Sequence, residues 1–235
     1  MATVGFDTAT DDTAVAVCDG DALHESLLGL SATGSPMHST ALLAEVERGV
    51  AETVGWDEVT MIAVGVGPGS FTGLRVGIAT ARALGLSRGL PVVGACTLDA
   101  IGRALGEREE SSAPALAALD ARRGEVFAAL YAPDGERLWD PLVSTPEGLT
   151  TRIGELPESP RAAGSGAVRF RQELARLGVA IPEDADPVHR ISARHICALA
   201  KVREGGERAG SPVPIYLRPP DAERWRERDT FQTAR

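Results

Sequence analysis

The sequence has 235 residues, of which 43% are hydrophobic and 24% are charged, and its formal net charge is -9 at pH 7. This composition indicates a folded protein of one large domain or two small ones, excludes a disordered chain, and makes unaided binding to nucleic-acid phosphates unfavourable. The three cysteines are widely separated and form no C-x-x-C pair, which is typical of a reducing compartment. There is no basic leader and no apolar run of about 20 residues, so we expect a cytoplasmic protein with no membrane contact.

The N-terminal part of the chain predicts three strands in succession, followed by helices that alternate with strands. Aspartate-rich turns separate the first three strands, as in hairpins. Strands are expected over 3–7, 13–18, 22–30, 61–66 and 91–95. Helices are expected over 35–54, after the loop that follows the fourth strand, and from about Leu98. This order describes a mixed sheet with crossover helices.

After a polar link over 107–112 the pattern partly repeats. Strands are expected over 115–120, 125–131, 136–143 and 162–165, and helices over 146–153, 168–177 and 191–202. The segment over 205–214 has the composition of a loop, and we expect the charged tail over 224–235 to be partly disordered.

A glycine-rich loop follows the fourth strand. Gly67-Pro68-Gly69 interrupts regular structure, because proline lacks a donor and glycine admits positive φ, and Ser70 or Thr72 can cap the next helix. In that helix small residues recur every four positions and form one face almost without side chains: Gly73, Gly77, Ala81 and Gly85. Glycine inside a helix costs about 1 kcal/mol relative to alanine. The stripe therefore requires a close contact, either with a helix of another molecule or with the chain's own sheet.

Five motifs follow one another over nearly the whole chain. They are Phe6-Asp7-Thr8-Ala9-Thr10, then Met37-His38-Ser39 with Leu42-Leu43, then Gly67-Pro68-Gly69-Ser70-Phe71-Thr72-Gly73-Leu74-Arg75-Val76-Gly77, then Leu119-Asp120-Ala121-Arg122-Arg123-Gly124-Glu125-Val126-Phe127, and finally Pro214-Ile215-Tyr216-Leu217-Arg218 with Pro220-Asp221-Ala222-Glu223. This set resembles the bacterial TsaB (YeaZ) family, the dimerisation subunit in the synthesis of threonylcarbamoyladenosine in transfer RNA.

The resemblance implies an α/β fold of the actin, Hsp70 and sugar-kinase superfamily (ASKHA), with two RNase H-like lobes and mixed sheets. We expect a first actin-like lobe over 1–106 and a second, smaller lobe over 107–188. A C-terminal helix and tail over 189–235 would return to the first lobe.

The resemblance also implies a non-catalytic scaffold that binds and organises the metal-containing subunit TsaD with the ATPase TsaE. That complex transfers a threonylcarbamoyl group to N6 of the adenosine 3′ of the anticodon, so tRNA would be met only through the complex, and a homodimer in isolation would suit the same surface. We expect the partner interface at His38, Leu42, Val46, Gly73, Gly77, Ala81 and Gly85. On this hypothesis Gly77→Leu abolishes partner binding and leaves the isolated fold largely intact.

A degenerate nucleotide cleft is the second candidate site. This superfamily places Mg-phosphate carboxylates at the end of the first strand of each lobe, where Asp7 and Asp120 stand in this chain. The loop at Gly67, Gly69 and Ser70 could add amide donors, but it lacks the P-loop spacing and its lysine. The alternative function is a stand-alone ASKHA-type small-molecule kinase or nucleotide-binding protein.

For the isolated subunit we expect no catalytic residue and no cofactor, with ATP or ADP only in the assembled complex. A metal site is also not expected. The partner family carries two metal-binding histidines on the helix that corresponds to the one beginning near His38, and here Leu42 stands where the second ligand would be needed.

Overall fold

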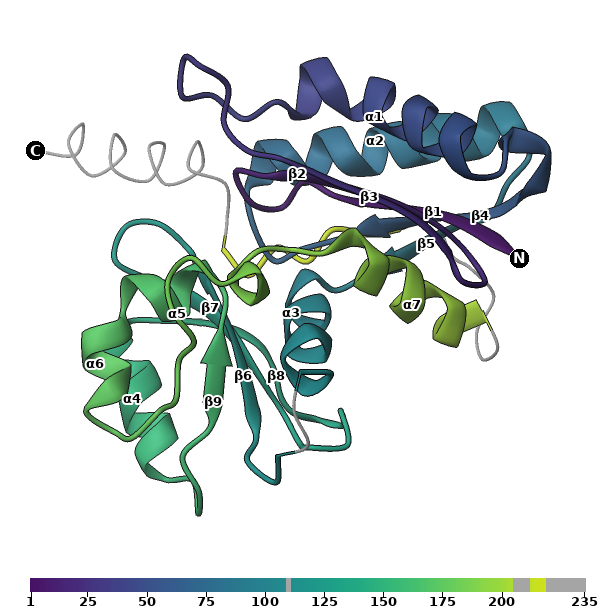
Figure 1. The fold of residues 1–235 in the computed structure, drawn as a ribbon. Coiled ribbons are helices and arrows are strands. Elements are labelled where there is room, and N and C mark those ends of the chain that lie inside the picture. Colours follow the sequence, from purple (N-terminus) through teal and green to yellow (C-terminus); the bar gives the residue numbers. More distant parts are fainter. Residues whose placement is uncertain (109–110, 205–211, 219–235) are drawn as a thin grey trace, which may run out of the picture.

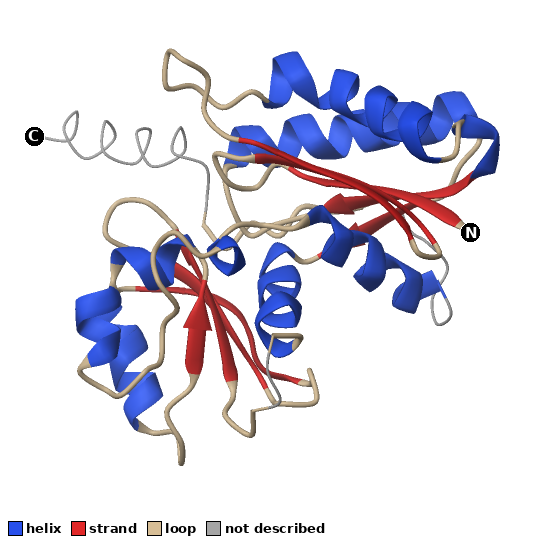
Figure 2. Ribbon diagram, viewed as in Figure 1, coloured by secondary structure: helices blue, strands red, loops and turns tan. Residues whose placement is uncertain are grey.

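The computed structural model describes residues 1–108, 111–204 and 212–218, which form two α/β lobes (Figure 1, Figure 2). The tail over 224–235 and most of the predicted loop over 205–214 lie outside the described residues. In the part of the chain that is described, no helix has both the length and the apolar character that crossing a membrane requires.

A five-stranded mixed sheet forms the first lobe. Its strands are β1 (Ala2–Asp7), β2 (Thr13–Asp19), β3 (Ala22–Leu28), β4 (Val59–Gly65) and β5 (Val92–Ala95). Their order is β3-β2-β1-β4-β5, with antiparallel pairing from β3 to β1 and parallel pairing from β1 to β5. β1 is buried along its whole length, as expected for a central strand covered on both faces.

Helices cover both faces of this first sheet. Helix α1 (His38–Thr53) and helix α2 (Phe71–Arg88) lie side by side on one face, and α7 (Ala193–Glu204) lies on the other (Figure 1). α1 begins three residues later than the position 35 expected, and its N-cap residue, Met37, makes no side-chain capping bond. Its end is followed by the short 3-10 helix η1 (Trp56–Glu58), which leads into β4.

The second lobe repeats this topology on a smaller scale. Its strands are β6 (Ala115–Asp120), β7 (Val126–Tyr131), β8 (Arg137–Ser144) and β9 (Arg161–Ala163), in the order β8-β7-β6-β9. Its helical segments are α4 (Pro146–Gly154), α5 (Ser165–Arg169), α6 (Arg171–Ala175) and the 3-10 helix η2 (Pro187–His189). The single helix predicted over 168–177 is wrong, because Phe170 leaves the helical region (φ -107°, ψ 28°) and separates α5 from α6.

At the junction, each of two helices follows one lobe in the sequence and packs against the sheet of the other lobe. Helix α3 (Thr97–Gly106) follows β5 of the first sheet but packs against β6, β7 and β9 of the second, and it contacts α7. The predicted lobe boundary at residue 106 had assigned α3 to the first lobe. Because α3 and α7 share a core with both sheets, the lobes are joined by packed apolar side chains rather than by a flexible link.

Candidate functional site

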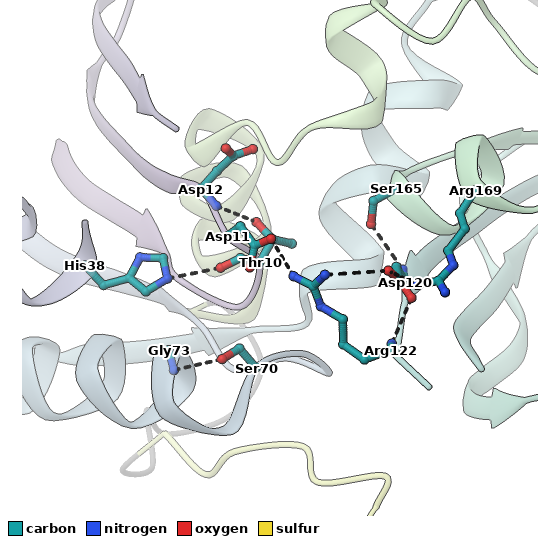
Figure 3. Close-up of polar contacts among 10 residues, drawn as sticks. All are labelled: Thr10, Asp11, Asp12, His38, Ser70, Gly73, Asp120, Arg122, Ser165 and Arg169. Carbon is teal, nitrogen blue, oxygen red and sulfur yellow. Dashed lines mark hydrogen bonds and ion pairs between the residues drawn. The ribbon is translucent and has the colours of Figure 1, made fainter. Parts of the chain in front are cut away.

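The glycine loop between β4 and α2 is closed by hydrogen bonds from within the chain. Ser70 caps α2 by accepting from the Gly73 N–H at 3.2 Å (Figure 3), and its own N–H donates to the Ala9 carbonyl at 2.7 Å. The Gly67 N–H donates to the Thr97 hydroxyl at 3.1 Å. The amides of Gly67, Ser70 and Gly73 therefore already have acceptors and are not directed at a bound phosphate.

Asp7, the first predicted phosphate-site carboxylate, is 1% exposed. One oxygen accepts from the Ala9 N–H at 2.7 Å, and the other accepts from the Thr97 hydroxyl at 2.7 Å. Burial raises the pKa of this carboxyl group. Since Thr97 begins α3, the carboxylate connects the end of β1 to the helix that crosses to the second lobe, and it acts as a structural brace.

Asp120, the second predicted carboxylate, lies among arginines (Figure 3). It accepts from Arg169 Nη1 at 2.6 Å and from the Arg122 N–H at 2.8 Å. The Arg122 guanidinium also reaches across to Asp11 of the first lobe at 2.5 Å. Both carboxylates are thus held by donors of the protein, and nucleotide binding at this place stays a prediction.

A C-terminal strap, residues 212–218, bridges the two lobes beside the loop. In the first lobe the Ile215 N–H donates to the Val66 carbonyl at 2.8 Å, and the Tyr216 ring lies 5.1 Å from that of Phe71. In the second lobe Arg218 donates to the Ala121 carbonyl at 2.6 Å and pairs with Glu125. The Pro214–Arg218 motif is visible in the sequence, but its residues alone do not predict this bridge.

The predicted interface residues do not lie on the surface, and this part of the prediction requires correction. His38, Leu42, Val46, Gly73, Gly77, Ala81 and Gly85 are all buried within the chain itself. A Cβ atom added at Gly73 would collide with the Thr8 carbonyl, at Gly77 with the Thr8 hydroxyl, and at Gly85 with Val92. The small residues allow α2 to approach its own sheet, which is the second of the two contacts that the stripe could serve.

His38 has an internal role at the start of α1. Its Nδ1 lies 2.8 Å from the Thr13 hydroxyl, and its Nε2 lies 3.1 Å from the Thr10 carbonyl (Figure 3). Burial lowers the pKa of its imidazole. Among the described residues, no group of three or more histidine, cysteine, aspartate and glutamate side chains could hold a metal ion.

The opposite side of α2 carries a different stripe, which we call the outer stripe: Val76, Ala79, Ala83 and Leu86. Val76 is half-buried and the other three are exposed, Leu86 to 88%. The spacing of three and four residues places them on one helical face. The adjacent helix α1 adds Leu43, which is 52% exposed.

The fold and this site define an actin-like α/β protein of two RNase H-like lobes. At its predicted phosphate site, Asp7 and Asp120 accept hydrogen bonds from donors of the chain itself. The apolar outer stripe lies on the surface of α2.

Comparison with known proteins specifies the family. The family model described as TsaD, tRNA N6-adenosine threonylcarbamoyltransferase, matches residues 33–189. The Escherichia coli tRNA threonylcarbamoyladenosine biosynthesis protein TsaB is 31% identical over 174 residues, which cover 71% of this chain and 72% of that protein. An uncharacterized Mycobacterium leprae protein is 37% identical over 173 residues, and the match spans 70% of this chain but only 40% of that protein.

A solved structure agrees with these sequence matches. YeaZ from Pseudomonas aeruginosa has a TM-score of 0.72 and 27% identity, with 92% of this chain and 99% of that chain covered. The chain therefore belongs to the TsaB (YeaZ) family, and the actin-like fold class expected from the sequence is confirmed.

Proposed function

We propose that this chain is a non-catalytic scaffold subunit in the synthesis of threonylcarbamoyladenosine in tRNA, and that it binds TsaD through α1 and α2. Its family relatives are named for this pathway. The observation that carries the scaffold role is the outer stripe, since Ala79, Ala83 and Leu86 expose an apolar seam on a helix. Exposed apolar surface of this kind favours a protein partner, and small side chains allow close approach of a second helix pair.

The state of the predicted cleft supports a role without catalysis. Asp7 is buried with each oxygen hydrogen-bonded, and Asp120 is paired with arginine, so neither resembles the open carboxylate that a Mg-phosphate site requires. In this proposal ATP or ADP enters only in the assembled complex, with TsaE, and tRNA is met there too. The net charge of -9 agrees with weak binding of tRNA by the chain alone.

Binding of TsaD to surface variants tests the proposal. Leu86→Glu and Ala79→Glu place a charge on the outer stripe without filling the interior, because both positions are exposed. If they lie at the centre of the contact, each should weaken TsaD binding by about 2 kcal/mol or more, roughly thirtyfold. Size-exclusion chromatography and calorimetry of the mixed proteins measure this loss.

A matched control is available on the second lobe. Leu138 on β8 is 50% exposed, and Leu138→Glu should leave TsaD binding unchanged. Normal affinity of both outer-stripe variants would overturn the assignment of this surface. Calorimetry of the lone chain with Mg-ATP addresses the kinase alternative: we expect no heat of binding, and micromolar binding with turnover would favour the kinase.

A further inference from the structure

Two cysteines pack in the same apolar cluster between β2 and α7. Cys18 lies on the face of β2 that is covered by α7 and is half-buried, whereas Cys197 of α7 is buried. Cys18 pairs in register with Thr3 of β1, and the Cys197 sulfur lies 3.7 Å from the Thr3 carbonyl oxygen and 3.9 Å from that of Ala16. The third cysteine, Cys96, is buried before α3.

The close approach of α7 at this point depends on a glycine. A Cβ atom added at Gly5 of β1 would collide with the Cys197 sulfur, so the thiol occupies the space that a larger residue would fill. The Cys197 thiol lies against the Thr3 and Ala16 carbonyls, and its interaction with the Cys18 sulfur lowers the pKa of Cys18 while raising that of Cys197. The two thiols therefore differ: Cys18 is half-buried and its pKa is lowered, whereas Cys197 is buried and its pKa is raised.

Three charged side chains act on the pair. Lys201, the one lysine of the sequence, follows Cys197 by one helical turn and favours the Cys18 thiolate, as does Arg194. Glu25 on the neighbouring strand β3 opposes ionisation, but it accepts hydrogen bonds from the Ser192 hydroxyl and the Arg194 N–H. A partly exposed cysteine whose pKa is lowered, next to a second thiol, is the usual arrangement of a redox-sensitive pair.

We propose that Cys18 is a site of oxidation by hydrogen peroxide and that Cys197 is its resolving thiol. The Cys18 thiolate attacks one peroxide oxygen, so that an S–O bond forms and the O–O bond breaks, and the leaving hydroxide takes up a proton to become water. The Cys197 sulfur then attacks the Cys18 sulfenic acid. An S–S bond forms, the S–O bond breaks, and the departing hydroxide combines with the Cys197 proton as a second water. The two thiols lose two electrons in total, and these reduce one peroxide.

The product would fasten α7 to the sheet of the first lobe. α7 also contacts α3, which covers the sheet of the second lobe, so the disulfide would lie next to the packed junction between the lobes. This inference does not depend on the proposed partner, because both thiols belong to the chain and lie on the face of the sheet opposite α1 and α2.

Oxidation of the full chain by hydrogen peroxide tests the proposal. After alkylation of the remaining thiols, peptide mass spectrometry without reductant should find a Cys18–Cys197 disulfide and alkylated Cys96. Burial raises the pKa of Cys96 to about 12. Cys18 therefore has the larger thiolate fraction, although a less basic thiolate is also a weaker nucleophile. Together these two effects predict that Cys18 is alkylated at least about fiftyfold faster than Cys96 at neutral pH.

Two conservative variants separate the roles of the thiols. With Cys197→Ser, dimedone should trap a sulfenic acid at Cys18, and with Cys18→Ser no dimedone adduct should form. The rate comparison with Cys96 is made within the unmodified chain, so it holds even if a variant folds poorly. Equal reactivity of Cys18 and Cys96, sulfinic acid at Cys18 without a disulfide, or only intermolecular disulfides would each overturn the proposal.

Discussion

Gly77→Ala inserts one methyl group into the contact between α2 and the end of β1. Thr8 is fully buried there, and its hydroxyl donates to the Gly73 carbonyl at 2.8 Å. An added Cβ atom at Gly77 would collide with this hydroxyl, so the Thr8 side chain has to rotate and give up its hydrogen bond. The substitution therefore tests directly whether the glycine stripe is required by internal packing.

The expected change in stability is the balance of two opposing effects. Alanine in place of a helical glycine stabilises by about 1 kcal/mol. Loss of a buried hydrogen bond costs about 1 kcal/mol, and crowding of a packed interior costs about 1–3 kcal/mol. The net result should be a free energy of unfolding lower by about 1–3 kcal/mol. Gly77→Leu should be worse still, so the expectation that it leaves the fold intact no longer holds.

A double-mutant cycle with Thr8→Ala provides the control. Without the hydroxyl, the nearest atoms to the new methyl group are the residue 8 Cβ at 3.6 Å and Val64 Cγ2 at 3.7 Å, which are ordinary contacts. In the Thr8→Ala background, Gly77→Ala should thus stabilise by about 0.5–1 kcal/mol. Urea unfolding followed by circular dichroism measures all four proteins. If Gly77→Ala raises the midpoint equally in both backgrounds, the close-contact argument is refuted.

Two further predictions concern pH and the strap. Burial lowers the pKa of His38 and of His195, so the unfolded chain binds more protons than the folded chain does. The free energy of unfolding should therefore be at its full value above about pH 6.5 and decline as the pH falls below it. Urea midpoints measured across this range should fall less steeply for His195→Gln, and an unaltered slope would contradict this account. Arg218→Ala removes the bonds to Ala121 and Glu125, so chymotrypsin should cut after Tyr216 in the strap sooner than in the native chain. Arg48→Ala, at an exposed position on α1, is the control and should leave this cleavage unchanged.

Strand positions were the most predictable part of the fold. The predicted strand over 115–120 coincides with β6, and β2 differs from the prediction by one residue. These strands are short apolar runs bounded by turn residues, which is a local signal. The position of α3 on the opposite lobe is not local. Its sequence shows an apolar face, but either sheet could receive that face, and only the packing of the whole chain decides between them.

The sequence also does not determine which face of α2 is buried. A stripe of small residues repeats every four positions, and an apolar seam repeats at three and four positions on the other side. Both patterns are compatible with burial. The decision depends on Thr8, whose carbonyl and side chain fill the space beside Gly73 and Gly77, 65 and 69 residues further along the chain. The spacing of residues along α2 carries no information about such a contact.

The two carboxylates also depend on residues that are distant in the sequence. Asp7 and Asp120 do stand at the ends of corresponding strands, β1 and β6, as the sequence indicated. Their chemistry is set by distant residues: Thr97 lies 90 residues after Asp7, and Arg169 lies 49 residues after Asp120. A carboxylate in this fold can ligate a metal-bound phosphate only if its oxygens are left open. In this chain other elements supply donors to both: Thr97 of α3 to Asp7, and Arg169 of α5 to Asp120.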